Sequence, residues 1–262
     1  MICAVSDAAR TERFLAALQG QDYPAVQLAA HWQAFGSLPG SGWQFYTGAE
    51  TDPLFALSVK GTAAQCVGLC DPEELGSFLG FLGVQQLAYR GPVPEGYRLA
   101  EPLCQFTLEA GSTLPAAAEP PAGFTLKEQP SMGPVTELLM EAPELAAGGQ
   151  DFYDAFYARS CALRNRGLAR IWALYGPDGQ IAATAGVYGI WQDRAYLTAV
   201  HTRSTLRRQG LGGWLVQALA GQLATEGIST GLWCHPPQAQ FYQNLGFVPS
   251  RPVPQIMAAG QE

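Results

Sequence analysis

The stretch Leu206-Arg207-Arg208-Gln209-Gly210-Leu211-Gly212-Gly213, followed directly by Trp214-Leu215-Val216-Gln217-Ala218-Leu219, decides the fold of this chain. It predicts a glycine-rich loop that opens an amphipathic helix, after a strand expected over residues 195–202. The first turn of a helix has N–H groups without intrahelical partners, at the positive end of the helix dipole. Gly210 and Gly212 let an anion approach the backbone, and Arg207 and Arg208 add charge. The pattern indicates a phosphate site; a glycine-rich helix start with solvated arginines is the alternative.

A second motif follows at residues Phe241-Tyr242-Gln243-Asn244-Leu245-Gly246-Phe247. Arg207, Gly210 and Gly212 fill an Arg/Gln-x-x-Gly-x-Gly/Ala pattern. The two motifs together resemble those of the GNAT superfamily of N-acetyltransferases, and the resemblance covers residues 123–257, about half of the chain. It implies the GNAT fold, an α/β fold in which helices flank a mixed, mostly antiparallel sheet.

Hydrophobic periodicity and turn residues predict the remaining elements. In the C-terminal half we expect strands at 124–127, 170–175, 180–190, 195–202 and 228–234, and helices at 134–140, 151–166, 211–226 and 237–244. In the N-terminal half we expect helices at 8–18, 26–32 and 71–82, and strands at 43–46, 54–59, 63–69, 86–89 and 103–108. Strands interleaved with helices are typical of an α/β fold.

The resemblance implies acetyl-CoA as the acyl-donor cosubstrate. Its pyrophosphate would lie on the glycine-rich loop, and its pantetheine arm beside the end of the preceding strand. The residues expected to bind it are Val200, His201, Thr202, Arg207, Arg208, Gln209, Gly210, Leu211, Gly212 and Gly213.

Tyr242 is the catalytic side chain that the resemblance implies. A phenol near the thioester sulfur can protonate the departing thiolate, because the ordinary pKa values of a tyrosine and a thiol are about 10 and about 8.5. A tyrosine that only packs under the helix is the alternative. Residues 196–202 contain no carboxylate, although many GNAT enzymes carry a glutamate there. His201 is the candidate general base, proton loss to water through a relay is the alternative, and Asp193 and Tyr196 are lesser candidates.

A segment rich in Pro, Ala and Gly predicts a linker over residues 112–122. We expect an N-terminal α/β domain over 1–111, a catalytic GNAT domain over 123–257 and a tail over 258–262. The smaller N-terminal domain repeats the alternation of helices and strands, as a degenerate GNAT-like repeat would. Its strand-to-helix turn reads Cys70-Asp71-Pro72-Glu73-Glu74, whose carboxylates would repel a pyrophosphate, so we expect no cofactor site there.

Composition narrows the function classes. The net charge is −7 with only 14% charged residues, which disfavours nucleic acid as a partner and suits an amine substrate. No apolar run approaches eighteen residues and the start has no basic region, so we expect no membrane partner, no signal peptide and a cytoplasmic location. The six scattered cysteines form no Cys-x-x-Cys pair, which predicts reduced thiols and no metal.

The leading hypothesis is an acetyl-CoA-dependent N-acetyltransferase that acts on a primary amine of a small molecule or peptide. The amine would attack directly in a ternary complex, because no cysteine has the paired base of a covalent nucleophile. A non-catalytic acyl-CoA-binding regulatory module is one alternative, and a tandem GNAT-like aminoacyl transferase that uses charged tRNA is another. The acceptor and the oligomeric state, a homodimer or another, stay open.

Overall fold

Two seven-stranded sheets organise the chain. The structure, a computed structural model, describes residues 1–20, 23–100, 103–112, 114 and 119–260. Contacts between backbone positions divide the chain into two compact units. Met1–Gln105, Cys234–Pro236 and Ser250–Glu262 form the first unit, and Phe106–Trp233 and Pro237–Pro249 form the second.

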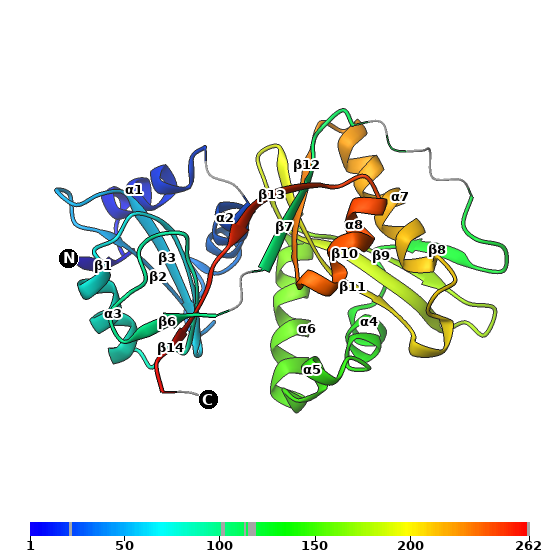
Figure 1. Ribbon diagram of the computed structural model, residues 1–262, viewed down its shortest axis with the longest axis horizontal. Helices are drawn as coiled ribbons and strands as arrows, with labels where there is room; N and C mark the ends of the chain where they lie inside the picture. Colours follow the sequence, from blue (N-terminus) through cyan, green and yellow to red (C-terminus); the bar gives the residue numbers. More distant parts are fainter. Residues whose placement is uncertain (21–22, 101–102, 113, 115–118, 261–262) are drawn as a thin grey trace. The chain divides into compact units, whose positions relative to one another are not determined.

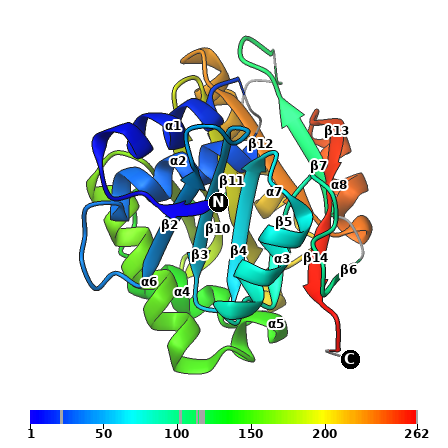
Figure 2. The same cartoon turned by 90° about the vertical axis from the view of Figure 1, so that its left-hand side faces the viewer.

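The first unit contains the sheet of order β1-β2-β3-β4-β5-β14-β6 (Figures 1 and 2). Its strands are β1 Ile2–Ala4, β2 Trp43–Gly48, β3 Phe55–Lys60, β4 Ala63–Gly68, β5 Gln86–Ala88, β6 Tyr97–Leu99 and β14 Gln255–Ala258. Its helices are α1 Ala8–Leu18, α2 Tyr23–Phe35 and α3 Pro72–Phe81. The core of the unit includes buried side chains from β3, β4, α3 and β5 (Leu57, Cys66, Leu75, Leu79 and Leu87).

The second sheet has the order β13-β7-β12-β11-β10-β9-β8. Its strands are β7 Leu103–Leu108, β8 Thr125–Glu128, β9 Arg170–Tyr175, β10 Ile181–Trp191, β11 Arg194–Thr202, β12 Ser229–Cys234 and β13 Val248–Val253. Its helices are α4 Met132–Leu139, α5 Pro143–Ala146, α6 Gly149–Asn165, α7 Leu211–Thr225 and α8 Ala239–Asn244. In Figure 1 α4 and α6 lie on one side of this sheet and α7 lies on the other.

The two sheets share one strand order. In each, a run of antiparallel neighbours ends in a parallel pair, β4 with β5 in the first sheet and β11 with β12 in the second. In each sheet, the strand after the parallel pair comes from the other half of the chain. In the first sheet β14 lies between β5 and β6, and in the second sheet β7 lies between β12 and β13. The expected GNAT-like repeat in the N-terminal half is therefore present as a fold.

Most predicted elements occur within a few residues of their expected places, and the differences have physical causes. The strand at 103–108 is β7, but it belongs to the second sheet. Helix α6 begins before its expected start at 151: Gly148 is the N-cap, and Asp151 lies in the first turn, where its charge suits the helix dipole. Residues 237–244 are not one helix, because a three-ten turn over Pro236–Gln238 precedes α8.

The division into units also differs from the expected contiguous domains. Residues 250–262 belong to the first unit because β14 pairs with β5 and β6, so the segment after 257 is not simply a tail. Of the expected linker over 112–122, residues 113 and 115–118 lie outside the described residues.

Candidate active site

Strand β11 leaves its neighbour at the point where the site begins. Its pairs with β12 run from Arg194↔Ser229 to Tyr196↔Gly231, and among the described residues of the two strands the pairing goes no further. On its other side β11 stays paired with β10 as far as Thr202, but the register shifts near Ala199, whose φ of 53° is left-handed. An extra residue at this β-bulge bends the strand, which opens the sheet between β11 and β12.

The glycine-rich loop connects this strand to α7. After a three-ten turn over Ser204–Leu206, both Arg208 and Gly210 adopt left-handed backbone angles, with φ of 66° and 80°. A left-handed non-glycine residue costs about 1–2 kcal/mol, so the loop holds a strained conformation at Arg208. The loop therefore folds as the sequence predicts, with a glycine where the turn into the helix requires one.

No side chain caps the start of helix α7. Gly210 is the N-cap and offers no side chain, and the first turn has no acidic residue. The first intrahelical bond joins the Trp214 N–H to the Gly210 carbonyl at 2.9 Å. The N–H groups of residues 211–213 precede that bond, so the helix start is suited to bind an anion.

Two glycines shape the approach to these N–H groups. A Cβ placed on Gly210 would have no atom within 4 Å, so the space above this residue is open to a ligand. A Cβ on Gly212 would lie 2.8 Å from Oγ1 of Thr202, closer than real side chains pack. Gly212 therefore lets the start of α7 lie directly against the end of β11, and Gly210 leaves the anion position uncovered.

A carboxylate that follows the end of α4 fixes the beginning of the loop. Oε2 of Glu141 accepts the Ser204 N–H at 3.0 Å, and Oε1 lies 3.6 Å from the Arg203 guanidinium. Arg203 also donates to the Ile181 carbonyl on β10 at 2.8 Å. Glu141 could not be predicted from the sequence, because nothing in its spacing links it to a loop 63 residues away.

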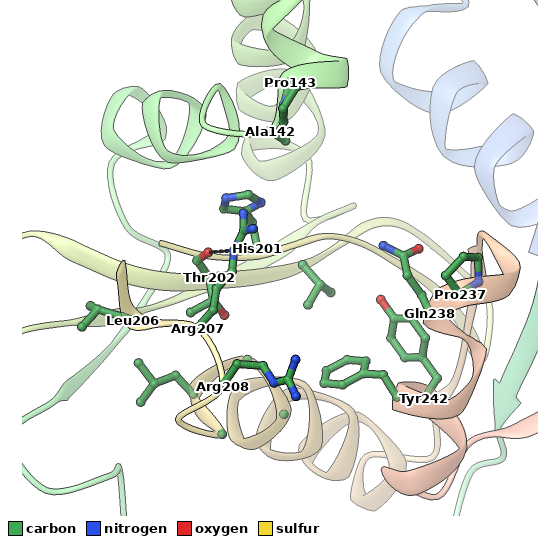
Figure 3. Close-up of a pocket in the computed structure, with 16 residues that line it drawn as sticks. Ala142, Pro143, His201, Thr202, Leu206, Arg207, Arg208, Pro237, Gln238 and Tyr242 are labelled. Carbon is green, nitrogen blue, oxygen red and sulfur yellow. Dashed lines mark hydrogen bonds between the residues drawn. The ribbon is translucent and has the colours of Figure 1, made fainter. Parts of the chain in front are cut away.

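These elements surround a cavity of about 670 Å³ (Figure 3). Nine of the ten residues expected to bind the cosubstrate line it: Val200, His201, Thr202, Arg207, Arg208, Gly210, Leu211, Gly212 and Gly213. Gln209 is exposed and is not among the lining residues. Besides these residues and Tyr242, the wall contains six residues that were not expected to contact the cosubstrate: Ala142, Pro143, Leu206, Pro237, Gln238 and Phe241.

The two loop arginines differ in their environments. Nε of Arg207 donates to the Thr202 carbonyl at 3.2 Å, so this side chain helps to hold the loop against β11. Arg208 is exposed, and in Figure 3 its guanidinium points past the start of α7 towards Tyr242 and its neighbours. Arg208 is therefore the better placed of the two to meet a negative charge above the helix.

Tyr242 reaches the same cavity from α8. Its ring is buried, with 8% of the residue exposed, among the rings of Phe106, Phe241 and Phe247 at centroid distances of 6.3, 5.0 and 6.0 Å. Figure 3 shows its hydroxyl pointing into the cavity, towards Gln238. The packed ring and the cavity-facing hydroxyl thus occur together rather than as alternatives.

The three candidate general bases lie at different distances along β11 from the cavity. His201 is half-buried and lines the cavity, and in Figure 3 its imidazole points towards Ala142 and Pro143, away from α7. Asp193 is exposed at the opposite end of β11, where its backbone carbonyl binds the Ser229 N–H. Tyr196 is buried against Trp233. Of the three, only His201 lines the cavity.

The corresponding position in the first unit is closed to anions. Helix α3 follows β4 as α7 follows β11, but its N-cap Asp71 accepts the Glu74 N–H at 2.9 Å, and Glu73 and Glu74 occupy its first turn. The Tyr89 hydroxyl accepts the Cys70 N–H at 3.1 Å, which joins the end of β4 to the end of β5. The chain's own groups therefore occupy the place that α7 leaves open.

Comparisons with known proteins agree with this fold. Residues 134–247 match the model of the acetyltransferase (GNAT) family. Over the full chain, the structure is similar to a tandem GNAT protein from the clavulanic acid biosynthesis pathway, solved without acetyl-CoA, with a TM-score of 0.64, 13% identity and 100% and 99% of the two chains covered. A comparison with curated proteins gives no match.

Two GCN5-related N-acetyltransferases are also similar in structure. The one from Kribbella flavida has a TM-score of 0.60 and 18% identity over 89% of this chain and 95% of its own. The one from Sphaerobacter thermophilus has a TM-score of 0.61 and 18% identity over 97% and 95%. The fold is that of a tandem GNAT protein. Its C-terminal half matches the GNAT family model over residues 134–247, and its N-terminal half has a second GNAT-like fold.

In the described part of the chain, no helix is long and apolar enough to cross a membrane. No group of three or more histidine, cysteine or acidic side chains among these residues is placed to hold a metal ion.

Proposed function

We propose that the protein is an acetyl-CoA-dependent N-acetyltransferase that acts on a primary amine of a small molecule or peptide. The observation that carries the proposal is the start of α7, which is uncapped, free of acidic side chains and open above Gly210. It shares one cavity with the end of β11 and with Tyr242. An anionic cosubstrate and a proton donor can therefore meet within a single site.

In the proposed complex, successive parts of acetyl-CoA would lie along the cavity. The N–H groups of residues 211–213 and the Arg208 guanidinium would hold the pyrophosphate. Where β11 leaves β12, beyond Tyr196, the strand offers an edge to which the amide groups of a pantetheine arm can pair. Bound there, acetyl-CoA supplies an acetyl group activated as a thioester.

Transfer to an amine needs two proton transfers, and we assign one to each of the two candidate side chains. The attacking nitrogen loses a proton as its bond to the acetyl carbon forms, and His201, on the α4–α5 side of β11, is the side chain proposed to accept it. The sulfur gains a proton as its bond to that carbon breaks, and the Tyr242 hydroxyl is proposed to donate it. The products are an N-acetylated amine and a free thiol.

The proposal is tested by thiol release from acetyl-CoA over a panel of polyamines, aminoglycosides, amino acids and peptides. We expect at least one class of amine to accelerate release. Tyr242→Phe removes the donor hydroxyl and keeps the ring among its three phenylalanine neighbours, so the rate should fall by about 10²–10⁴-fold. Stabilisation of the variant by acetyl-CoA should persist.

The same variant separates catalysis from the non-catalytic alternative. A regulatory acyl-CoA-binding module would bind acetyl-CoA and release no thiol with any amine, and Tyr242→Phe would change nothing measurable. Thiol release that is unaffected by Tyr242→Phe would assign the proton donor elsewhere.

A further inference from the structure

A positively charged side chain lies between α6 and the second sheet. Arg159 belongs to the helix face whose other members, Phe156, Ser160 and Leu163, are buried. Its guanidinium lies 5.4 Å from the centroid of the Phe156 ring. Burial lowers the pKa of Arg159, because the charged form loses hydration, and the nearby tyrosines Tyr188 and Tyr196 oppose that shift.

Arg159 has no carboxylate partner among the described residues. Arg159 is half-buried, and a charge that is partly withdrawn from water is normally paired, because an unpaired one is costly. Its neighbour on the same helix, Arg164, differs, since it donates to the Pro130 carbonyl at 2.9 Å. The guanidinium of Arg159 therefore has donors to offer to a ligand.

The hydroxyl of Tyr188, near Arg159, is a second polar group without a partner in the described part of the chain. Tyr188 on β10 is 3% exposed, and its hydroxyl is buried with no hydrogen-bond partner in the described part of the chain. Its ring packs against Phe156 at 5.4 Å, and the charge of Arg159 acts on its hydroxyl. Because most buried hydroxyls have a hydrogen-bond partner, this one and the guanidinium together mark a site prepared for an acceptor of hydrogen bonds.

The cluster lies beside the opening between β11 and β12. Tyr196, within reach of the charge of Arg159, is the last β11 residue that pairs with β12. Its ring packs edge-on against Trp233 of β12 at 5.4 Å. Arg159 and Tyr188 thus stand on the α6 side of the place where the sheet opens.

We propose that Arg159 and Tyr188 bind the carboxylate of the acceptor, so that the acceptor is an amine that also carries a carboxylate, as an amino acid or a peptide C-terminus does. This inference rests on the proposed acetyl transfer. A guanidinium binds the two oxygens of a carboxylate with parallel N–H groups, and the tyrosine O–H supplies a third donor. One unpaired guanidinium balances a charge of −1. In a chain of net charge −7, an anionic group needs such a local positive charge to bind.

The test compares amines with and without this carboxylate: glycine with glycinamide, L-lysine with L-lysinamide, and dipeptides with free or amidated C-termini. Thiol release from acetyl-CoA should favour the acids by about 10- to 100-fold in kcat/KM, as expected for a charge-assisted pair that is shielded from water. Arg159→Gln should remove that preference by slowing the acids alone. Arg159→Lys should restore part of it, and Tyr188→Phe should reduce it less.

Arg166→Gln is the matched control, because it removes the same charge from the exposed end of the same helix region and should leave the preference intact. Retained stabilisation by acetyl-CoA shows that each variant is folded. Equal rates for acid and amide in the unmodified protein, or an equal loss of both in Arg159→Gln, would overturn the inference. A stronger preference for a phosphorylated amine such as phosphoethanolamine would overturn the assignment to a carboxylate.

Failure of the proposed function has a different signature, which is no thiol release with any amine. The acid–amide pairs are then compared by the melting temperature they induce. A rise with the acids alone that Arg159→Gln abolishes supports the carboxylate site, and no difference between the pairs overturns it.

Discussion

Gly212→Ala tests how closely α7 must approach β11. The added Cβ would lie 2.8 Å from Oγ1 of Thr202, inside the shortest separation that side chains show. Relief requires the helix start or the strand end to move, and overpacking of this kind costs about 1–3 kcal/mol. The same movement displaces the N–H groups of residues 211–213, so we expect both a less stable protein and weaker binding of acetyl-CoA.

A double-mutant cycle isolates this contact. Thr202→Ala removes the oxygen that the new methyl group meets, so Gly212→Ala should cost at least about 1 kcal/mol less in that background. Denaturant unfolding measures the stabilities, and the rise in melting temperature with acetyl-CoA measures the effect on the site. Gly221→Ala is the control, because its Cβ would meet only Leu114 at 3.8 Å, and alanine in a helix interior should stabilise by up to about 1 kcal/mol. A Gly212→Ala variant with full stability and full response to acetyl-CoA would refute the reasoning.

Three other perturbations follow from the structure. Gly210→Glu places a carboxylate in the open space above the helix start, so acetyl-CoA should no longer raise the melting temperature. Without ligand the melting temperature should fall by only a few degrees, because a left-handed glutamate is strained. A full rise with acetyl-CoA would place the cosubstrate elsewhere. Glu141→Gln weakens the anchor on Arg203 and should lower acetyl-CoA affinity severalfold without changing the rate at saturation; calorimetric titration that finds equal affinities would exclude this role. Burial, aided by Glu74 and Asp71, raises the pKa of Cys70 to about 11, so its thiolate is scarce at pH 8 and increases as the pH approaches 11. At pH 8 Cys70 should react with Ellman's reagent more than tenfold more slowly than an ordinary thiol. Fast labelling of Cys70 in the folded protein would contradict the closed turn before α3.

The sequence predicts those parts of the fold that depend on residues close together in the chain. The end of α7 is an example: Gly227 adopts a φ of 80°, and the Ile228 N–H returns to the Leu223 carbonyl at 2.9 Å, the helix termination that a glycine at this place indicates. The glycine-rich loop is another, because Gly210 is needed for a left-handed turn wherever the helix packs. Both features are encoded within a few residues.

Contacts between distant segments could not be predicted in this way. The exchange of strands β7 and β14 joins segments that are far apart in the chain, and no local pattern records such pairing. Helix α2 was expected only over 26–32, because its apolar residues continue around the helix and blur the periodicity that marks a helix face. The surroundings of Arg159 are equally hidden in the sequence, since Tyr188 and Tyr196, which act on its charge, belong to β10 and β11.

The central claim is that α7 and β11 form an acetyl-CoA site, and thermal unfolding with and without the cosubstrate tests it most directly. A ligand at one hundred times its Kd stabilises the folded state by about 2.7 kcal/mol, which corresponds to a rise of about 5–10 °C in the melting temperature of a domain of this size. We expect that rise with acetyl-CoA in the unmodified protein and its loss in Gly210→Glu. No rise at saturating acetyl-CoA in the unmodified protein would contradict the account.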